Sequence, residues 1–248
     1  MVYIKSEQEI EKMRKANSLV MKILLTLKDI IKPGLNIEVL EKKAIELTRK
    51  NGAIPAFKGY QGYPAALCVS INETIIHGIP YKKILKEGDI VSLDFGVLLN
   101  NFYGDAAITV PVGSVSKEAM RLINVTREAL YRGIAMAIPG NRLGDISSAI
   151  QNYVEGNGFS VIRDFTGHGI GRNLHEDPAI PNFGRAGTGL KIEKGMTFAL
   201  EPMVTAGSYE VEILHDGWTT VTKDGSLSAH FEHTIAVTET EPEILSTV

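Results

Sequence analysis

The chain has 248 residues, of which 44% are hydrophobic and 22% charged, and its formal net charge is -3. These values are typical of a globular protein and fit one α/β domain or two closely joined halves. No run of Lys or Arg is long enough to follow phosphates, so we expect no nucleic-acid substrate. The single cysteine, Cys68, and the absence of a long apolar run predict a cytoplasmic protein with neither a signal peptide nor a membrane anchor.

The beginning of the chain predicts a helical hairpin. Ser6 and Glu9 form a capping box, and apolar residues then recur at helical spacing until Pro33-Gly34 end the first helix. A second amphipathic run ends at Asn51-Gly52, a common signal for a helix C-terminus.

The same order of signals returns later in the chain. A helical run after Ser116 reaches Pro139-Gly140, and a further run ends at Asn157-Gly158. Both pairs stand 106 residues after their counterparts, since 33 becomes 139 and 51 becomes 157. We therefore predict one domain over residues 1–248, made of two duplicated halves, roughly 1–110 and 111–248, with a cleft between them.

A strand hairpin is predicted to place two carboxylates side by side. Residues 90–97 alternate with Asp94 on the polar face, and Asn100-Asn101 can adopt the positive φ of a tight turn before a second strand. Asp105 should then lie opposite Asp94 or one diagonal step away. Two carboxylates this close have raised pKa values or share a cation; an isolated Asp is more often a turn or surface residue.

The second half adds comparable polar groups to apolar strands. Glu201 ends the run 198–201, Glu232 interrupts the run 231–235, and His168 lies in a glycine-rich stretch whose spacing does not match a nucleotide-binding loop. Four carboxylates and one imidazole suit two divalent ions with a bridging carboxylate. The candidate ligands are Asp94, Asp105, His168, Glu201 and Glu232.

His77 and His175 lie in turn-like sequence beside proline residues. Such a histidine can present its ring to a substrate, or it can be a solvated loop residue, and local sequence favours neither interpretation.

Several motifs together resemble the type I methionine aminopeptidases, which have the pita-bread fold. The resemblance covers essentially the whole chain and rests on residues 59–64, 70–73, 77–80, 167–171, 201–204 and 228–234. It implies an α/β protein in which two pseudo-two-fold related α+β halves surround a central antiparallel sheet. It also implies a metal-dependent hydrolase that removes the initiator methionine from nascent proteins and peptides. The chain lacks the N-terminal extension of many eukaryotic type I members and the insertion of type II, which suggests a bacterial or organellar-like form.

The same resemblance implies roles for the candidate residues. Asp94, Asp105, His168, Glu201 and Glu232 match the ligands of two divalent ions, whose identity among Co, Mn, Fe and Zn the sequence leaves open. His77 and His175 match residues that contact substrate and stabilise the tetrahedral intermediate, and Glu201 matches the residue that moves a proton to the leaving amine.

A narrow apolar pocket for the methionine side chain is implied as well. Tyr60, Tyr63, Cys68 and Trp218 match that pocket, although core packing would explain any one of them alone. Phe57 stands where bacterial members often have cysteine, and Leu174 where an aromatic residue is common. The sequence therefore does not determine the width of the pocket.

The expected partners are the N-terminal methionine of nascent chains and, transiently, the ribosome, and the expected state is a monomer. Two alternatives have the same fold. An X-Pro aminopeptidase or prolidase usually carries an additional N-terminal domain, for which this chain has no room, and it would cleave X-Pro rather than Met-Ala-Ser peptides. A non-catalytic binding protein would fail to bind two metal ions.

Overall fold

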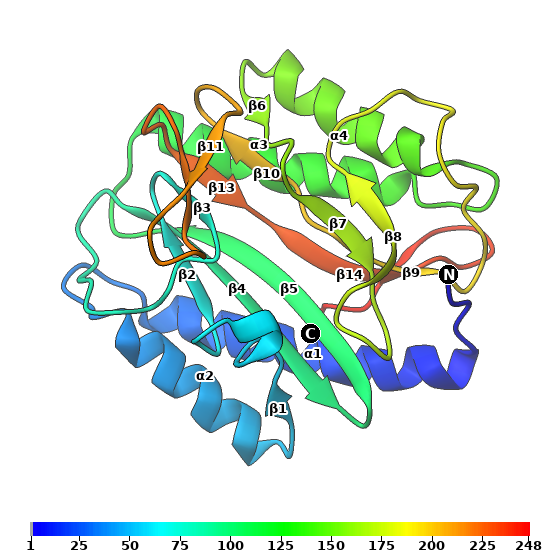
Figure 1. Ribbon diagram of the computed structural model, residues 1–248, viewed down its shortest axis with the longest axis horizontal. Coiled ribbons are helices and arrows are strands. Elements are labelled where there is room, and N and C mark those ends of the chain that lie inside the picture. The colour runs from blue at the N-terminus through cyan, green and yellow to red at the C-terminus, as the bar shows by residue number, and fades with distance from the viewer. Residues whose placement is uncertain (1) are drawn as a thin grey trace.

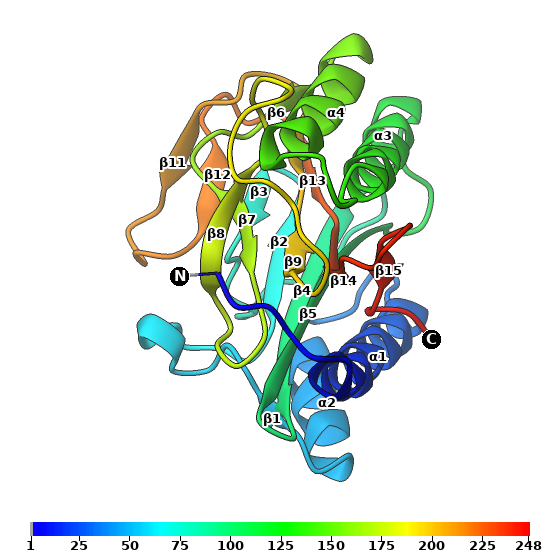
Figure 2. The same cartoon turned by 90° about the vertical axis from the view of Figure 1, so that its right-hand side faces the viewer.

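The computed structural model describes residues 2–248, in which four α-helices pack against one large antiparallel sheet (Figure 1). Figure 2 shows the helices gathered on one face of this sheet. The helices are α1 (Glu7–Ile30), α2 (Glu38–Lys50), α3 (Lys117–Ala135) and α4 (Leu143–Gly156), with a 3₁₀ turn, η1, at Tyr60–Gly62. No helix within residues 2–248 combines the length and apolarity that a membrane crossing requires.

The predicted helix boundaries are confirmed. Ser6 caps α1 by accepting a hydrogen bond from the Glu9 N–H, and the Glu9 side chain accepts one from the Ser6 N–H in return. The Asn51 N–H bonds back into the last turn of α2, and Gly52 follows with φ 69°. The Ser116 side chain likewise accepts a hydrogen bond at the start of α3. Each of these contacts joins residues within four positions, which is why the sequence alone predicts them.

The large sheet has the strand order β1-β4-β5-β14-β9-β7-β8, with β2 also paired to β4 and β15 to β14. Two three-stranded sheets, β13-β10-β6 and β11-β12-β3, lie beside it. The strands are β1 (Ile54–Pro55), β2 (Cys68–Ile71), β3 (Thr74–Ile76), β4 (Ile90–Leu99), β5 (Phe102–Pro111), β6 (Ser160–Val161), β7 (Thr166–Gly169), β8 (Glu176–Pro181), β9 (Thr197–Leu200), β10 (Met203–Thr205), β11 (Val211–Ile213), β12 (Thr220–Thr222), β13 (Ser228–His230), β14 (Glu232–Ala236) and β15 (Glu243–Ile244).

Two hydrophobic clusters hold the helices to the sheet. One contains the inner face of α1 and α2 with the apolar residues of β2, β4 and β5, including the fully buried Phe95. The other joins α3 and α4 to the second group of strands around Phe198 and Ile235. Each cluster leaves the opposite face of the sheet free for polar side chains, and that face carries the candidate site. The division into duplicated halves near residue 110 stays a prediction.

Candidate active site

The hairpin β4–β5 brings Asp94 and Asp105 onto one face of the sheet. Asn100 and Asn101 form its turn with φ values of 52° and 64°, as predicted. Asp94 is paired with Ala107, and Asp105 with Gly96, so the two aspartates lie one diagonal step apart rather than directly opposite. The Asp105 N–H donates to Asn17 Oδ1 over 3.1 Å. Helix α1 therefore helps to fix this strand position.

Strand β14 adds Glu232 to the same row. Ala107 of β5 is the partner of both Asp94 and Glu232, so the two carboxylates flank one small residue across three strands. Residues paired across an antiparallel sheet share a face, and therefore these carboxylates point the same way. Glu232 and Asp105 are each only 3% exposed.

His168 and Glu201 come from the next strands along the sheet. His168 of β7 is paired with Ala199 of β9, and Glu201 follows two residues later on the same face. Oε1 of Glu201 lies 3.5 Å from Nε2 of His168. The other ring nitrogen, Nδ1, lies 2.8 Å from the Gly169 carbonyl and donates to it, which leaves Nε2 unprotonated and directed at the carboxylates.

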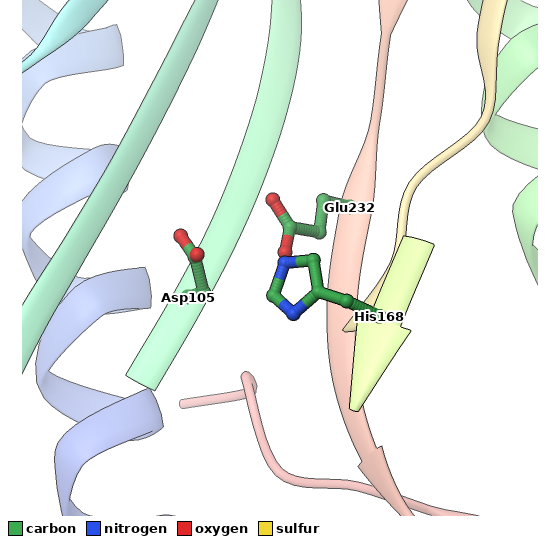
Figure 3. Close-up of side chains that lie close together, drawn as sticks. All are labelled: Asp105, His168 and Glu232. Carbon is green, nitrogen blue, oxygen red and sulfur yellow. The ribbon is translucent and has the colours of Figure 1, made fainter. Parts of the chain in front are cut away.

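Figure 3 shows Asp105, His168 and Glu232 pointing toward one another from three strands. One ligand atom from each of these side chains lies within 4.8 Å of the other two. The glycines beside His168 permit this packing, because a Cβ on Gly167 would lie 2.5 Å from the Ala199 carbonyl oxygen and one on Gly169 would overlap that of Asp177. These glycines thus let neighbouring backbones approach His168 closely.

Without a cation, the charged forms of these buried carboxylates are unfavourable. Burial raises the pKa of Asp94 to about 7, and burial together with the charge of Asp94 raises the pKa of Asp105 well above its ordinary value. Burial and the charges of their acidic neighbours raise the pKa values of Glu201 and Glu232 in the same direction. Burial lowers the pKa of His168 to about 3, so its ring is neutral at pH 7.

Several of these oxygens also have no partner. Within residues 2–248, Oδ1 of Asp94, Oδ1 of Asp105 and Oε1 of Glu232 are buried without a hydrogen bond. Buried polar atoms without partners are rare and unfavourable, and carboxylates of this kind suit divalent cations. The arrangement of one neutral imidazole and four inward carboxylates fits a metal centre.

A cavity of about 410 Å³ opens onto this cluster. Its walls include all five candidate ligands, together with Tyr60, Tyr63, Cys68, His77, His175 and Trp218. Tyr63 and Trp218 meet edge to face with ring centroids 5.2 Å apart, and the Tyr63 hydroxyl donates to the Gly78 carbonyl over 3.2 Å. The cavity is thus a mostly aromatic pocket that ends at the acidic cluster of candidate metal ligands.

The two loop histidines both line this cavity, and His175 lies at its exposed edge. Burial and the nearby His175 lower the pKa of His77 to about 4, and burial also lowers the pKa of His175. The His175 ring lies 4.3 Å from the His168 ring between centroids, and its Nδ1 lies 2.8 Å from the Tyr60 hydroxyl. His77 itself has φ 58°, a conformation that few side chains adopt outside constrained sites.

Comparison with known proteins identifies the family of the chain. The profile of "Metallopeptidase family M24" matches residues 11–239. The chain belongs to metallopeptidase family M24. Methionine aminopeptidase from Clostridium perfringens is 53% identical over 248 residues, all of both chains, and methionine aminopeptidase 1 from Bacillus subtilis is 49% identical, also over all of both chains. The expected resemblance to methionine aminopeptidases is thereby confirmed.

Solved structures of M24 proteins agree on the fold. The crystal structure of methionine aminopeptidase from Thermotoga maritima has a TM-score of 0.99 at 51% identity and covers all of both chains. Prolidase from Pyrococcus furiosus has a TM-score of 0.79 at 24% identity, and the match spans 99% of this chain but 65% of the prolidase, a likeness of fold alone. The pita-bread fold predicted from the sequence is confirmed.

The structure adds further side chains to this candidate site. Phe57 and Leu174, the two departures from the family pattern, both line the cavity, as does Phe165, whose ring meets His77 at 5.8 Å. The sequence motifs did not single out His230, which is 1% exposed and whose Nε2 lies 3.7 Å from Oε2 of Glu201. Its place two residues before Glu232 is the period of a strand face and could have identified it.

Proposed function

We propose that the chain is a methionine aminopeptidase that hydrolyses the first peptide bond of nascent proteins and peptides after an N-terminal methionine. The observation that carries this proposal is the junction of the aromatic pocket with the acidic cluster. Methionine is unbranched and polarizable, so its side chain suits a narrow pocket of aromatic rings and the Cys68 sulfur. A residue bound there has its own carbonyl next to the cluster. The methionine aminopeptidases that the chain resembles support the same substrate.

The cluster would hold two divalent ions through Asp94, Asp105, His168, Glu201 and Glu232. Four buried carboxylates carry a charge that two divalent ions neutralise, whereas one ion would leave an excess of negative charge. Bound ions of this kind polarise a peptide carbonyl and make water nucleophilic near neutral pH. Oxygen-rich donors accept Mn, Fe, Co or Zn, so the occupant is set by supply rather than by the ligands.

The residues around the cluster then share the remaining work. At pH 7 the His77 and His175 rings are neutral, and each can donate an N–H to the oxygen of the tetrahedral intermediate. If the Tyr60 hydroxyl donates to Nδ1 of His175, the ring keeps its proton on Nε2, the tautomer that such donation needs. Glu201, with one oxygen turned away from His168, would carry the proton to the leaving amine.

The metal site also favours a free chain terminus. A free α-amino group would serve as a ligand to one of the ions, while the nitrogen of an internal peptide bond is not basic and would not bind. We place the reaction in the cytoplasm and the working protein as a monomer that meets nascent chains transiently at the ribosome. These points rest on the single buried cysteine and on the family resemblance.

The test measures free methionine released from Met-Ala-Ser by metal-stripped protein as Mn²⁺, Fe²⁺, Co²⁺ or Zn²⁺ is added back. We expect no release from the stripped protein and recovery with at least one ion. An acetyl-Met-Ala-Ser peptide serves as the matched control, because it keeps the side chain and removes the free α-amino group, and it should stay intact. Cleavage of an Ala-Pro peptide with Met-Ala-Ser unchanged would assign the X-Pro activity instead.

The number of ions is a separate measurement. Calorimetric titration of the stripped protein with Mn²⁺ should give two equivalents. Absence of binding would favour a non-catalytic protein of this fold.

A further inference from the structure

A buried ion pair joins the N-terminal segment to the loop that carries His175. Nζ of Lys5 lies 2.5 Å from Oε2 of Glu176, and the two side chains are 4% and 1% exposed. The two residues are 171 positions apart in the chain. Charged groups are rarely buried so completely, because both must lose their water, and such a pair is tolerated when its remaining hydrogen bonds are also satisfied.

The remaining hydrogen bonds of the Glu176 carboxylate are satisfied within its own loop. Its other oxygen, Oε1, accepts hydrogen bonds from the N–H groups of Arg172 at 2.8 Å and Asn173 at 3.0 Å. The carboxylate therefore ties the start of the turn, at Arg172 and Asn173, to its end, where Glu176 itself stands. Because two of its partners belong to the backbone, the Glu176 side chain has little freedom to move.

Lys5 is fixed from the other side. Its N–H donates to the Gly195 carbonyl over 2.8 Å, and its Nζ also donates to the Tyr3 carbonyl over 3.3 Å. A Cβ on Gly171 would overlap Cε of Lys5, so the loop and the lysine stem are in direct contact. Figure 2 shows the N-terminal segment passing beside β8 before it enters α1.

The residue that this anchor holds most directly is His175. Glu176 follows it immediately and begins β8, and the His175 ring must stay over His168 and within 2.8 Å of the Tyr60 hydroxyl. A displacement of about 1 Å in a group that meets the reacting atoms can cost about 100-fold in rate. The backbone position of Glu176 thus decides whether His175 reaches its place.

We propose that the buried Lys5–Glu176 pair is a positioning device, through which the N-terminal segment holds His175 at the mouth of the active site. Neither residue lines the cavity or belongs to the metal cluster, so both act through His175. The inference rests on the proposed function, because it assigns His175 a contact with the substrate.

A second ion pair between the same two segments provides a matched control. Arg172 Nη2 lies 2.5 Å from Oε1 of Glu9, but the Arg172 side chain is 67% exposed. Surface pairs of this kind contribute little. Glu9→Gln therefore removes the charge pair with Arg172 without changing the buried anchor, and the glutamine oxygen can still accept from the Ser6 N–H at the start of α1.

The experiment measures Met-Ala-Ser hydrolysis by the full-length, Mn²⁺-loaded protein and its variants. In Lys5→Met/Glu176→Gln no buried charge is left unpaired, and the new side-chain amide oxygen can still accept from the loop N–H groups, so this double variant is expected to fold. We expect kcat to fall about 10- to 100-fold with KM within about threefold. The single variant Lys5→Arg keeps a positive charge beside Glu176, so its kcat should fall less than that of the double variant. The kcat of Glu9→Gln should stay within about twofold of the wild type.

A His175→Ala background tests whether the double substitution lowers kcat by displacing His175. If the anchor acts through that ring, adding the double substitution should cost less than about threefold more. A full additional loss in this background would overturn the proposal, since it would mean a general structural effect. Full activity of the double variant beside an active wild type would overturn it too, and it would leave the proposed function standing.

A measurement that does not use activity tests the positioning role separately from the proposed aminopeptidase function. In metal-free protein labelled with ring-¹³C histidine, the His175 signal is identified by its loss in His175→Ala. The double substitution should shift or broaden this signal, whereas Glu9→Gln should leave it in place. An unchanged signal rejects the positioning role even if the wild type turns out to cleave no Met peptide.

Discussion

Replacing Asp94 by asparagine should stabilise the metal-free protein while it removes activity. Burial raises the pKa of Asp94 from 3.8 to about 7. Because one pH unit corresponds to about 1.4 kcal/mol, ionising this carboxyl in the folded protein costs on the order of 4 kcal/mol at pH 8. Asparagine has nearly the same shape and carries no charge, so the variant avoids this cost.

The sign of the pH dependence follows from the raised pKa. Below about pH 4 the carboxyl is protonated in both the folded and the unfolded chain, and the substitution should change the free energy of unfolding little. The penalty on the wild type grows as the pH rises from about 4 to about 7 and is complete above that range. At about pH 5.5 the gain should be roughly half of that at pH 8.

Thermal unfolding followed by circular dichroism in excess EDTA measures this effect. For a chain of this length 1 kcal/mol corresponds to about 2 to 4 °C, so the Tm of Asp94→Asn should exceed that of the wild type by roughly 10 °C at pH 8. Mn²⁺ at about 100 times its Kd should stabilise the wild type by about 2.7 kcal/mol and the variant by less, which narrows the gap.

Asp145→Asn is the control with the opposite sign. The Asp145 carboxylate accepts from the N–H groups of Arg142 and Gly187, which lower its pKa, so its loss should reduce the free energy of unfolding at neutral pH. A lower Tm for Asp94→Asn than for the wild type in EDTA at pH 8 would refute the reasoning. It would mean that the cluster carries no electrostatic frustration in the absence of metal.

Three further predictions concern the same site. Asp105→Ala and Glu232→Ala should each lower kcat/KM by at least about 1000-fold with an unchanged circular dichroism spectrum, and undiminished rates would remove both from the ligand set. His175→Ala should lower kcat about 100-fold while calorimetry finds the same Mn²⁺ affinity, and an equal loss of metal would make it a ligand. Mn²⁺ affinity should fall as the pH drops below about 7, because the Asp94 carboxyl takes up a proton that the ion must displace; a flat profile between pH 8 and 6 would contradict this.

The sequence predicted those parts of the site that depend on neighbours along the chain. The turn at Asn100 and Asn101 and the alternation around Asp94 were enough to place Asp105 near it on one face. They left two registers open, and the pairing of Asp94 with Ala107 selects the diagonal one. Residue type and motif likewise led to His168, Glu201 and Glu232 as candidates, although no local pattern says how far apart they lie.

What the sequence by itself determined was the set of helices, the central hairpin and the kind of chemistry, because capping residues, turn residues and strand alternation act over a few positions. Only the tertiary structure decided that β14 lies beside β5 and β9, that His230 approaches Glu201, and that Lys5 is buried against Glu176. The first two of these arrangements form because two hydrophobic clusters bring distant strands together. The last contact joins residues 171 positions apart, beside a third cluster in which Met13 of α1 packs with Ile170 and Leu174. Their geometry follows from the packing of the whole sheet, which no short stretch of sequence contains.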